Sequence, residues 1–586
     1  MTSPMTHVFR LTVALACLTG ATICPAQNSK GQKSSVQDMI DAAIRDGQRR
    51  VVLPAGVVRV EKGLLIAKAK GLTIEGRQTT LVIGKHKGNG LHFRGCRDIT
   101  LRGVAIDYDP LPFTQGTVVG STPDGNGFEF EVHAGYPDLS EEYLIRHVHI
   151  FEPNQLRWKR EAPDIYARRT EAITPRRGRI VFPAKSKYLS HIRPGDRLVL
   201  NMRTGSTIAF NQCENMRVEG VTILAGPGCA VIVRYARGDN RYQFDIRPGP
   251  KPAGATQPRL MSTCADGFNY AFARRGPVLE NCRFSFMGDD SVNLHGTTFG
   301  VVEVVSPTEL LIGRPYGPEP YDWLMEPGDV FRTLQPADFA IKGQSTMAAL
   351  KRERDLRDRY AHKIKGFWPR MRPDSGTVYR LTLQAPLPAQ AGDFLDVPSD
   401  AAPHFRISGC TFSDHRARGV RVMSSHGVIE NNTIRRVKHL GISVGTEYAY
   451  WREAGWVKDV VIRNNRIEDV GEAISTCIPT NYVPGAICVF GRTEGRDSVP
   501  PFVQGNEKIT IENNSIRGCA VAGIYAYAAK HLIVRGNTVS HVLYGDTKTT
   551  GTERGLDVKK PIDLRRASDV TEENNHVSEI GVPLGR

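Results

Sequence analysis

Short segments of alternating apolar and polar residues recur along this chain, and each ends in glycine or asparagine. Examples are Leu72–Gly76, Ile99–Gly103, Val428–Asn432, Val461–Asn465 and Ile509–Asn514. Alternation with a period of two is typical of a β-strand with one buried face. Glycine and asparagine tolerate the left-handed backbone of a tight bend. The pattern therefore predicts short strands that are joined by sharp bends.

The spacing between the bends indicates how these strands stack. Gly409 and Asn431 are 22 residues apart and Asn513 and Gly536 are 23 apart, while other intervals are stretched by loops. A repeat in the low twenties with three strands is typical of a parallel β-helix. Asparagines that recur at one bend would stack into a ladder of side-chain amides. A leucine-rich horseshoe is the nearest alternative, but its spaced leucines are missing.

Two segments, residues 110–205 and 298–403, interrupt the repeat and read as strands joined by turns. We expect each to be a β-barrel-like insertion in an all-β fold whose main body is a right-handed parallel β-helix. The insertions flank the coils that contain Asp266 and Asp290. They are therefore expected to form the walls of a cleft.

The first residues have the features of a targeting segment. The apolar run Leu11–Ile23 follows an arginine, is too short to span a bilayer, and precedes a cleavage site after Ala26. The sequence thus predicts a signal peptide, 1–26, and a mature catalytic chain, 27–586, that is secreted or periplasmic. A lipoprotein anchor at Cys17 is the alternative. We expect no stable membrane insertion, because no other stretch is long and apolar enough.

The net charge and the cysteine content limit the kinds of partner and metal site that this chain is expected to have. The chain has 77 Lys and Arg against 61 Asp and Glu, a formal net charge of +16. Such a charge suits polyanionic partners, and for a secreted protein a glycan is favoured over nucleic acid. A basic surface kept for solubility is the alternative. The 11 cysteines show no short paired spacing, which argues against a disulfide framework and a zinc site. We expect no metal and no cofactor.

Three aspartates lie in two short clusters beside glycine. Asp266 precedes Gly267, and Asp289 and Asp290 follow Gly288, so Asp266 and Asp289 are 23 residues apart. This distance is about one coil, and adjacent strands lie about 4.8 Å apart, so we expect Asp266 to be stacked on Asp289. Neighbouring carboxylates push each other's pKa values apart, which lets one act as an acid and the other as a base.

Further polar residues fall on the same face when they are counted from the bends. This counting places Arg418, His439 and Glu472 in a column with the aspartates, and His295 follows the second cluster. A purely structural column would be aliphatic or made of Ser, Thr or Asn. We therefore expect these four side chains to bind a substrate. A salt-bridge network or a set of satisfied surface groups is the alternative interpretation.

The loop Gly445–Trp456 carries aromatic and acidic residues. The ring of Trp451 can stack on the C–H edges of a sugar, and the carboxylate of Glu447 can accept hydroxyl protons. The alternative is that Trp451 and Trp456 belong to the core. Paired carboxylates without a nucleophilic Ser or Cys arrangement, a metal-spaced His cluster or a phosphate loop indicate cleavage of a glycosidic bond. The sequence leaves open whether the cleavage inverts or retains configuration.

Several motifs resemble those of glycoside hydrolase family 110. They are Cys264–Phe268, Glu280–Phe284, Asp289–Gly296, His415–Gly419, Val428–Asn432 and Trp451–Gly455. This family consists of secreted bacterial exo-acting α-galactosidases that remove terminal α-1,3-linked galactose with inversion. The resemblance implies that Asp266, Asp289 and Asp290 form the catalytic set, with Asp266 as the acid and the other two activating water. Thr446–Tyr448 departs from the family pattern, which leaves the substrate less defined than the chemistry.

Other functions stay open at this point. Family 28 polygalacturonases share the β-helix and a similar aspartate set, but their Gly-His-Gly and Arg-Ile-Lys motifs are absent. A polysaccharide lyase acting on an anionic glycan would use Arg418 as its base and the carboxylates as a calcium site. A non-catalytic adhesin would have no polar column. The expected substrate is a galactose-terminated oligosaccharide or polysaccharide, either of the blood-group-B type or a sulfated galactan, which the positive charge favours.

Overall fold

The computed structural model describes residues 35–585, apart from 161, 163–164, 184–185, 370–375, 449–450, 472–483, 492–504 and 546–557. Val36–Arg586 form one compact unit. The segment expected to be a signal peptide lies outside the described residues. Within the described part of the chain, no helix is long and apolar enough to cross a membrane.

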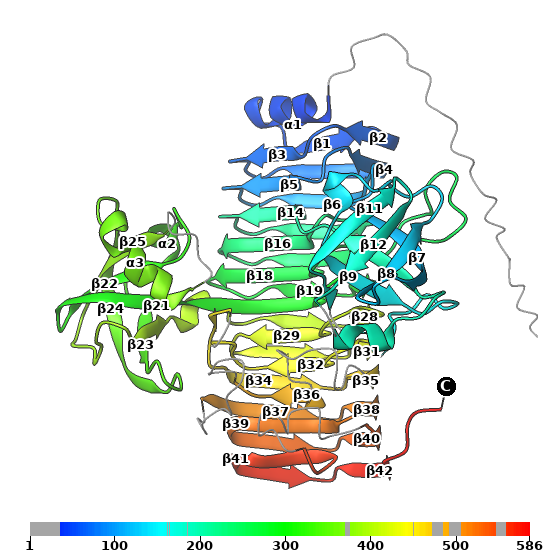
Figure 1. Cartoon of the computed structure of the whole chain (residues 1–586). Coiled ribbons are helices and arrows are strands. Elements are labelled where there is room, and N and C mark those ends of the chain that lie inside the picture. The colour runs from blue at the N-terminus through cyan, green and yellow to red at the C-terminus, as the bar shows by residue number, and fades with distance from the viewer. Residues whose placement is uncertain are drawn as a thin grey trace, which may run out of the picture. The chain divides into compact units, whose positions relative to one another are not determined.

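The compact unit is built on coils of parallel strands that stack one on the next (Figure 1). The strands form three ladders along the stack. The first ladder contains β1 (Arg50–Leu53), β4 (Thr73–Ile83), β6 (Thr100–Tyr108), β15 (Arg217–Ile223), β17 (Arg241–Ile246), β19 (Val278–Glu280), β27 (Arg406–Ser408), β30 (Gly427–Glu430), β34 (Lys458–Arg463), β37 (Asn506–Glu512), β39 (Ala522–Arg535) and β41 (Ile562–Glu573).

The second ladder carries the candidate site. It contains β3 (Leu64–Ala67), β5 (Gly88–Arg94), β14 (Gly205–Asn211), β16 (Cys229–Ala236), β18 (Phe268–Ala273), β21 (Val292–Ser306), β29 (Val420–Met423), β32 (Ile442–Val444) and β36 (Gly485–Val489), and it continues through the first parts of β39 and β41.

The third ladder begins at β2 (Gly56–Val60) and continues through the later parts of the long strands β4, β6, β15 and β17. It then runs through β20 (Arg283–Ser285), β28 (Thr411–Ser413), β31 (Thr433–Arg435), β35 (Arg466–Val470), β38 (Ser515–Cys519), β40 (Thr538–Val542) and β42 (His576–Ile580). The helix α1 (Val36–Arg45) packs against β1 and β3 at the first coil and buries Val36, Ile40 and Ala43. The predicted parallel β-helix is confirmed.

The bends explain why glycine and asparagine recur. Asn431, Asn464 and Asn513 have positive φ angles of 54° to 56°, as Gly409 does at 65°. Where an asparagine follows the bend residue, it points into the coil, and its side-chain N–H donates to the side-chain oxygen of the asparagine in the next coil at 2.9–3.0 Å. This predicted amide ladder runs through Asn432, Asn465, Asn514, Asn537 and Asn575.

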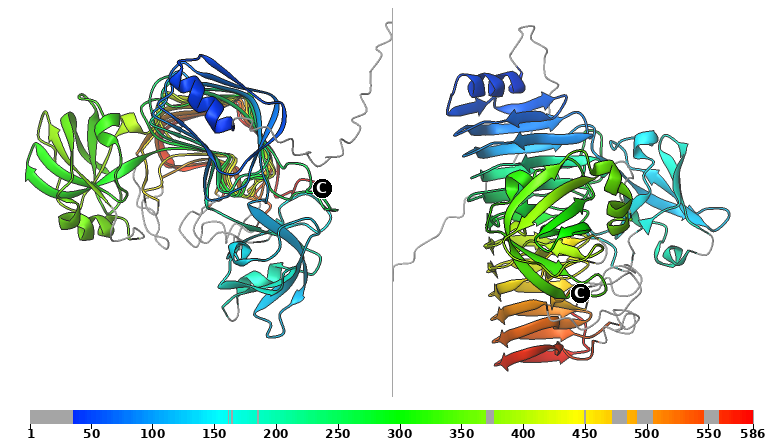
Figure 2. Two further views of the ribbon diagram at one scale, coloured as in Figure 1. Left: turned by 90° about the horizontal axis from the view of Figure 1, so that it is seen from above. Right: turned by 90° about the vertical axis from the view of Figure 1, so that its left-hand side faces the viewer.

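The first insertion leaves the β-helix after β6 and returns at β14. It is a seven-stranded antiparallel sheet in the order β10-β9-β13-β7-β8-β12-β11. Its strands are β7 (Phe113–Ser121), β8 (Gly127–Val132), β9 (His147–Phe151), β10 (Ile165–Tyr166), β11 (Arg169–Thr174), β12 (Arg177–Val181) and β13 (Arg197–Asn201), with short 3₁₀ turns at Glu141–Tyr143 and Lys187–His191. In Figure 2 the sheet stands beside the coils.

The second insertion continues directly from β21, whose later half leaves the second ladder. Its strands pair in the closed antiparallel ring β21-β22-β25-β24-β23-β26-β21. The added elements are β22 (Glu309–Arg314), α2 (Tyr321–Leu324), β23 (Val330–Leu334), β24 (Ile341–Glu353), α3 (Arg357–Phe367), β25 (Thr377–Leu383), β26 (Phe394–Asp396) and a 3₁₀ turn at Pro398–Asp400. We call this insertion the barrel, and aromatic residues such as Phe299 and Tyr379 fill its core.

Candidate active site

The aspartates lie in the short loops that lead into the second ladder. Asp266 precedes β18, Asp289 and Asp290 precede β21, and Arg418 precedes β29. Backbone hydrogen bonds hold these loops in line, because Gly267 N donates to Asp290 O at 2.8 Å and Ser291 N donates to Arg418 O at 2.9 Å. The coil repeat therefore brings together residues that are distant in sequence.

The pairing differs by one residue from the sequence prediction. Phe268 pairs with Val292, so one coil here is 24 residues, and the neighbour of Asp266 in the column is Asp290. The expectation that Asp289 is stacked on Asp266 was wrong, because that coil has one residue more than the assumed period. Asp289 remains close enough to raise the pKa of Asp266.

Asp266 is the carboxyl group that keeps its proton. Its side chain accepts a hydrogen bond from Asn269 Nδ2 at 2.7 Å and is buried. Burial raises the pKa of Asp266 to about 8, and the negative charges of Asp289 and Asp290 add to the effect. At neutral pH this group can therefore donate a proton.

Asp289 is surrounded by positive charges, whereas Asp266 has negative neighbours. Arg203 Nη2 donates to Asp289 Oδ2 at 2.7 Å, and Arg416 Nη2 donates to Oδ1. Burial acts to raise the pKa of Asp289, but the two arginines outweigh it and hold this pKa well below its usual range. Asp289 is therefore ionised, although its side chain is still 18% exposed.

Asp290 is fixed to the next coil. Its Oδ1 accepts the backbone N–H of Arg418 at 2.9 Å, and the Arg418 guanidinium lies 3.0 Å and 3.1 Å from its two oxygens. The predicted neighbour His439 is also buried, and burial with nearby Arg418 and Arg416 lowers the pKa of His439 well below its usual value. Val420 pairs with Ile442, so Leu440 is the residue of the next coil that aligns with Arg418. His439 therefore lies one position before the column.

The other predicted binding residues lie on the outward face of the second ladder and on the loop beside it. His295 Nε2 lies 3.7 Å from Glu453 Oε1, and burial lowers the pKa of His295 to about 4. Glu447 lies 3.8 Å from Arg421, and Trp451 is 57% exposed. Trp456 is buried in the core, as the alternative for this loop expected. The predicted Glu472 lies outside the described residues.

Sequence reasoning missed several charged and polar residues of this site. They are Arg203, Asn269, Arg416, Arg421 and Glu453. Arg203 follows β13, the last strand of the first insertion, and Arg416 lies 127 residues after Asp289, so no local spacing pointed to either. Arg421 gave one usable signal, since it is the polar position of the apolar strand β29.

Two buried amides face this same surface. Asn269 pairs with Asn293, and Asn293 pairs with Arg421, so the three residues lie side by side across β18, β21 and β29. Among the described residues, the side-chain oxygens of Asn269 and Asn293 have no hydrogen-bond partner. Buried polar atoms are usually paired, so these oxygens are suited to accept bonds from the hydroxyl groups of a ligand.

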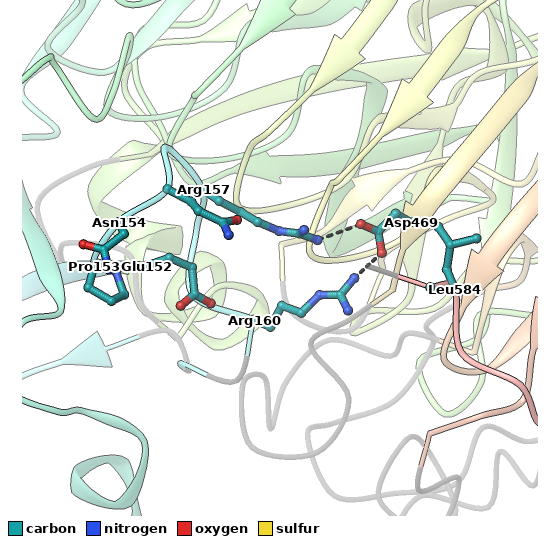
Figure 3. Close-up of a pocket in the computed structure, with 9 residues that line it drawn as sticks. Glu152, Pro153, Asn154, Arg157, Arg160, Asp469 and Leu584 are labelled. Atoms are coloured by element: carbon teal, nitrogen blue, oxygen red, sulfur yellow. Dashed lines mark hydrogen bonds and ion pairs between the residues drawn. The ribbon is translucent and has the colours of Figure 1, made fainter.

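A separate cavity of about 390 Å³ lies between the first insertion, β35 and the C-terminal segment (Figure 3). Arg157 and Arg160 point toward one carboxylate, Asp469, and Arg157 lies 2.7 Å from it. This ion pair joins the insertion to the coil. The cavity contains none of the three aspartates, and no group of three or more His, Cys, Asp or Glu in the described part of the chain could hold a metal ion.

Comparison with known proteins agrees with the fold and the resemblance. The family described as "Right handed beta helix region" matches residues 396–480. Solved structures that resemble the chain include the catalytic domain of a GH87 α-1,3-glucanase, with 11% identity, a TM-score of 0.41 and coverage of 95% of this chain and 68% of that one. The A-module of Azotobacter vinelandii mannuronan C-5 epimerase AlgE4 has 10% identity, a TM-score of 0.31 and coverage of 94% and 92%. TM-scores this low do not bear on function.

Curated relatives are more informative. Alpha-1,3-galactosidase B of Bacteroides thetaiotaomicron is 24% identical over 69% of this chain and 64% of its own length. Alpha-1,3-galactosidase A of Shewanella woodyi is 23% identical over 72% and 67%, and that of Streptomyces avermitilis is 23% identical over 81% and 75%. The chain thus spans about two thirds of the first of these relatives. It is a homologue of bacterial proteins named α-1,3-galactosidase.

Proposed function

We propose that this chain is a glycoside hydrolase that releases terminal α-1,3-linked galactose with inversion of configuration. The observation that carries the proposal is the juxtaposition of a protonated Asp266 with an ionised Asp289 in neighbouring loops of the second ladder. Glycosidic cleavage needs one carboxyl group as acid and another as base. The names of the curated relatives support galactose as the sugar.

The two carboxyl groups have distinct roles in this reaction. Asp266 gives its proton to the glycosidic oxygen as the C1–O bond breaks. Asp289 takes a proton from the water whose oxygen bonds to C1, so that one galactose and one shortened glycan leave. Asp290 holds Arg418 in place and adds negative charge beside Asp266, which favours the protonated form of Asp266. The inversion itself rests on the family resemblance.

The outward face of the second ladder supplies the sugar contacts. The unpaired amide oxygens of Asn269 and Asn293 accept hydrogen bonds from sugar hydroxyl groups, and Arg421 donates hydrogen bonds. Trp451 is exposed and offers its ring to a sugar face, as carbohydrate-binding aromatics do through their apolar surface. His295, with a pKa lowered to about 4, is neutral and so adds no charge to this surface near pH 7.

A sulfated galactan is the second candidate substrate. Arg203 and Arg416 share the single carboxylate of Asp289, so positive charge is in excess at this end of the site. Guanidinium groups bind oxyanions through paired, directed donors. A sulfate ester on the sugar next to the scissile bond would find such donors here. We also propose that the reaction takes place outside the cytoplasm, on the basis of the predicted signal peptide.

The test is galactose release from α-1,3-galactobiose and from p-nitrophenyl α-galactoside. We expect release that a chelator leaves unchanged, with the β-anomer as the first product seen by NMR. Asp289→Asn should lower kcat by roughly 10²–10⁴-fold, the usual contribution of an acid or base. Asp245→Asn is the matched control, because Asp245 is a partly exposed carboxylate paired with Arg247 in the third ladder.

The two aspartate variants also separate the roles. Nitrophenolate leaves without being protonated, so cleavage of the nitrophenyl substrate depends little on the general acid. Asp266→Asn should therefore retain more activity on this substrate than on the disaccharide. If Asp289→Asn showed this pattern instead, Asp289 would be the acid. An unsaturated product that absorbs in the ultraviolet would establish a lyase, and an α-anomeric first product would rule out inversion.

A further inference from the structure

The loop after β32 forms a hairpin that lies between the barrel and the second ladder. We call its described residues, Thr446–Tyr448 and 451–456, the site hairpin. Glu447 and Glu453 exchange two backbone hydrogen bonds of 3.1 Å. Its short strand β33 (Glu453–Ala454) pairs antiparallel with β21, where Ala454 lies opposite Gly296. The site hairpin is therefore attached to the strand that joins the aspartate loop to the barrel.

This attachment brings an acidic side chain into the candidate site. Glu453 Oε2 lies 3.1 Å from Arg421 Nη2, and Glu453 Oε1 lies 3.7 Å from His295 Nε2. The Glu453 side chain is mostly buried, with 16% of it exposed, and burial alone would raise its pKa. The positive charge of Arg421, with those of Arg418 and Arg234, outweighs burial and lowers the pKa of Glu453. Glu447 lies 3.8 Å from the same Arg421 nitrogen, so two acidic side chains of the site hairpin orient this guanidinium.

A buried tyrosine anchors the other side of the site hairpin to the barrel. The Tyr448 hydroxyl donates to Asp396 Oδ2 and accepts the backbone N–H of Trp456 at 3.2 Å. Asp396 belongs to β26 and is held by Arg332 at 2.8 Å and 2.7 Å. The Tyr448 ring stacks on Phe339 of the barrel, with 4.7 Å between centroids and 6° between planes.

Two more contacts fasten the same segment. Trp456 Nε1 donates to Phe339 O at 2.9 Å, and the Arg452 guanidinium lies 4.7 Å from the centroid of the Phe394 ring. All of these partners come from the barrel. None of them contacts the three aspartates directly, so these contacts influence the site through the position of the site hairpin.

We propose that the barrel serves to position the site hairpin and that Tyr448, through Asp396, is the positioning residue that keeps Glu453 against Arg421. This inference rests on the proposed function, since it assigns Arg421 and Glu453 to the binding of the sugar. The second insertion would then have a positioning role in addition to forming one wall of the cleft. The catalytic aspartates lie on the coil and do not depend on this anchor.

Tyr448→Phe tests the inference, because it keeps the stacked ring and removes the hydroxyl. We expect the KM for the galactoside to rise by roughly tenfold, the effect of losing a buried hydrogen bond to a charged group, with a smaller change in kcat. A contact made equally in the ground state and the transition state changes KM in this way. Asp396→Asn, which keeps the shape but removes the charge, should shift KM in the same direction.

Tyr143→Phe is the matched control, since its buried hydroxyl donates to Leu111 O at 2.7 Å in the first insertion. It should lose similar stability without a change in KM. Hydrogen exchange at the Glu447 and Glu453 amides gives a second measurement that needs no activity. We expect these amides to exchange faster in Tyr448→Phe and not in the control.

The outcomes are distinguishable. Exchange and KM both unchanged in Tyr448→Phe would overturn the positioning role. Faster exchange with no galactose release by the unaltered protein would keep the anchor and overturn the proposed function. Equal KM shifts in Tyr448→Phe and Tyr143→Phe would show that the effect is general destabilisation and would also reject the inference.

Discussion

Asp266 and Asp289 are the same residue type in neighbouring loops, yet their surroundings give them opposite protonation. Asp266 has one amide donor and two negative neighbours, whereas Asp289 has two guanidinium groups. The sequence located both aspartates because they stand beside glycine at coil spacing. It missed the arginines. Arg203 reaches Asp289 only after the first insertion has folded, and Arg416 reaches it only after the next coil has formed. The protonation pattern therefore depends on tertiary contacts.

The pH dependence of activity follows from the raised pKa of Asp266. We expect kcat/KM for α-1,3-galactobiose to stay high from pH 6 to 7 and to fall as the pH rises through about 8, where Asp266 loses its proton. The low pKa of Asp289 keeps the acidic limb of the profile well below neutral pH. An alkaline limb that is unchanged in Asp266→Glu or Asp266→Asn would show that another group is the acid.

The stability of the protein should report the same pKa independently of catalysis. The folded-state pKa of Asp266 is higher than that of an unfolded aspartate. Folding therefore takes up a proton, and the resulting stability is lost as pH rises toward about 8. Asn in place of Asp266 carries no charge at any pH. We expect Asp266→Asn to change the free energy of unfolding little at pH 4 and to increase it relative to the native chain at pH 9.

At the scale of elements, the repeat was predictable because the bends contain asparagine or glycine, the residues that tolerate a left-handed backbone. Asn431 or Asn464 takes the left-handed bend, and the next asparagine enters the amide ladder, so the Asn-Asn pair specifies two positions at once. The site hairpin was not predictable. Its place is set by Tyr448 and by partners in the barrel that lie about 50 to 120 residues earlier in the chain.

The amide ladder should contribute measurably to stability. Asn465 accepts from Asn432 and donates to Asn514 and to Ile429 O, so Asn465→Ala leaves several buried groups unpaired. We expect the free energy of unfolding to fall by about 3 kcal/mol, since each orphaned buried group costs about 1–3 kcal/mol. Chemical denaturation gives the measurement.

The control for the ladder is the neighbouring residue. Arg466 forms an exposed ion pair with Glu468, and Arg466→Ala should cost less than about 1 kcal/mol. Equal losses in Asn465→Ala and Arg466→Ala would mean that the amide ladder adds nothing beyond the strand pairing around it.

At the scale of the whole molecule, the net charge of +16 favours the approach of anionic glycans. Long-range attraction is screened by salt, with a Debye length of about 10 Å at 0.1 M. If sulfated galactosides are substrates, their KM should rise severalfold between 50 and 300 mM NaCl, while the KM of neutral galactobiose stays constant. The comparison is made by steady-state kinetics on the two substrates. Equal salt responses would remove the support for a sulfated substrate.

The closed ring of the barrel also bears on how the chain folds. Val292 and Val420 are partners in the second ladder but lie 128 residues apart in sequence. Joining such distant positions costs loop-closure entropy that grows with the logarithm of the loop length. Inside the ring, Thr298 already pairs with Asp396, so a folded barrel brings its two ends together. Once the barrel has folded, the loop that remains to be closed between Val292 and Val420 is short, and its entropic cost is small. The coils that follow can then be added after the barrel has closed.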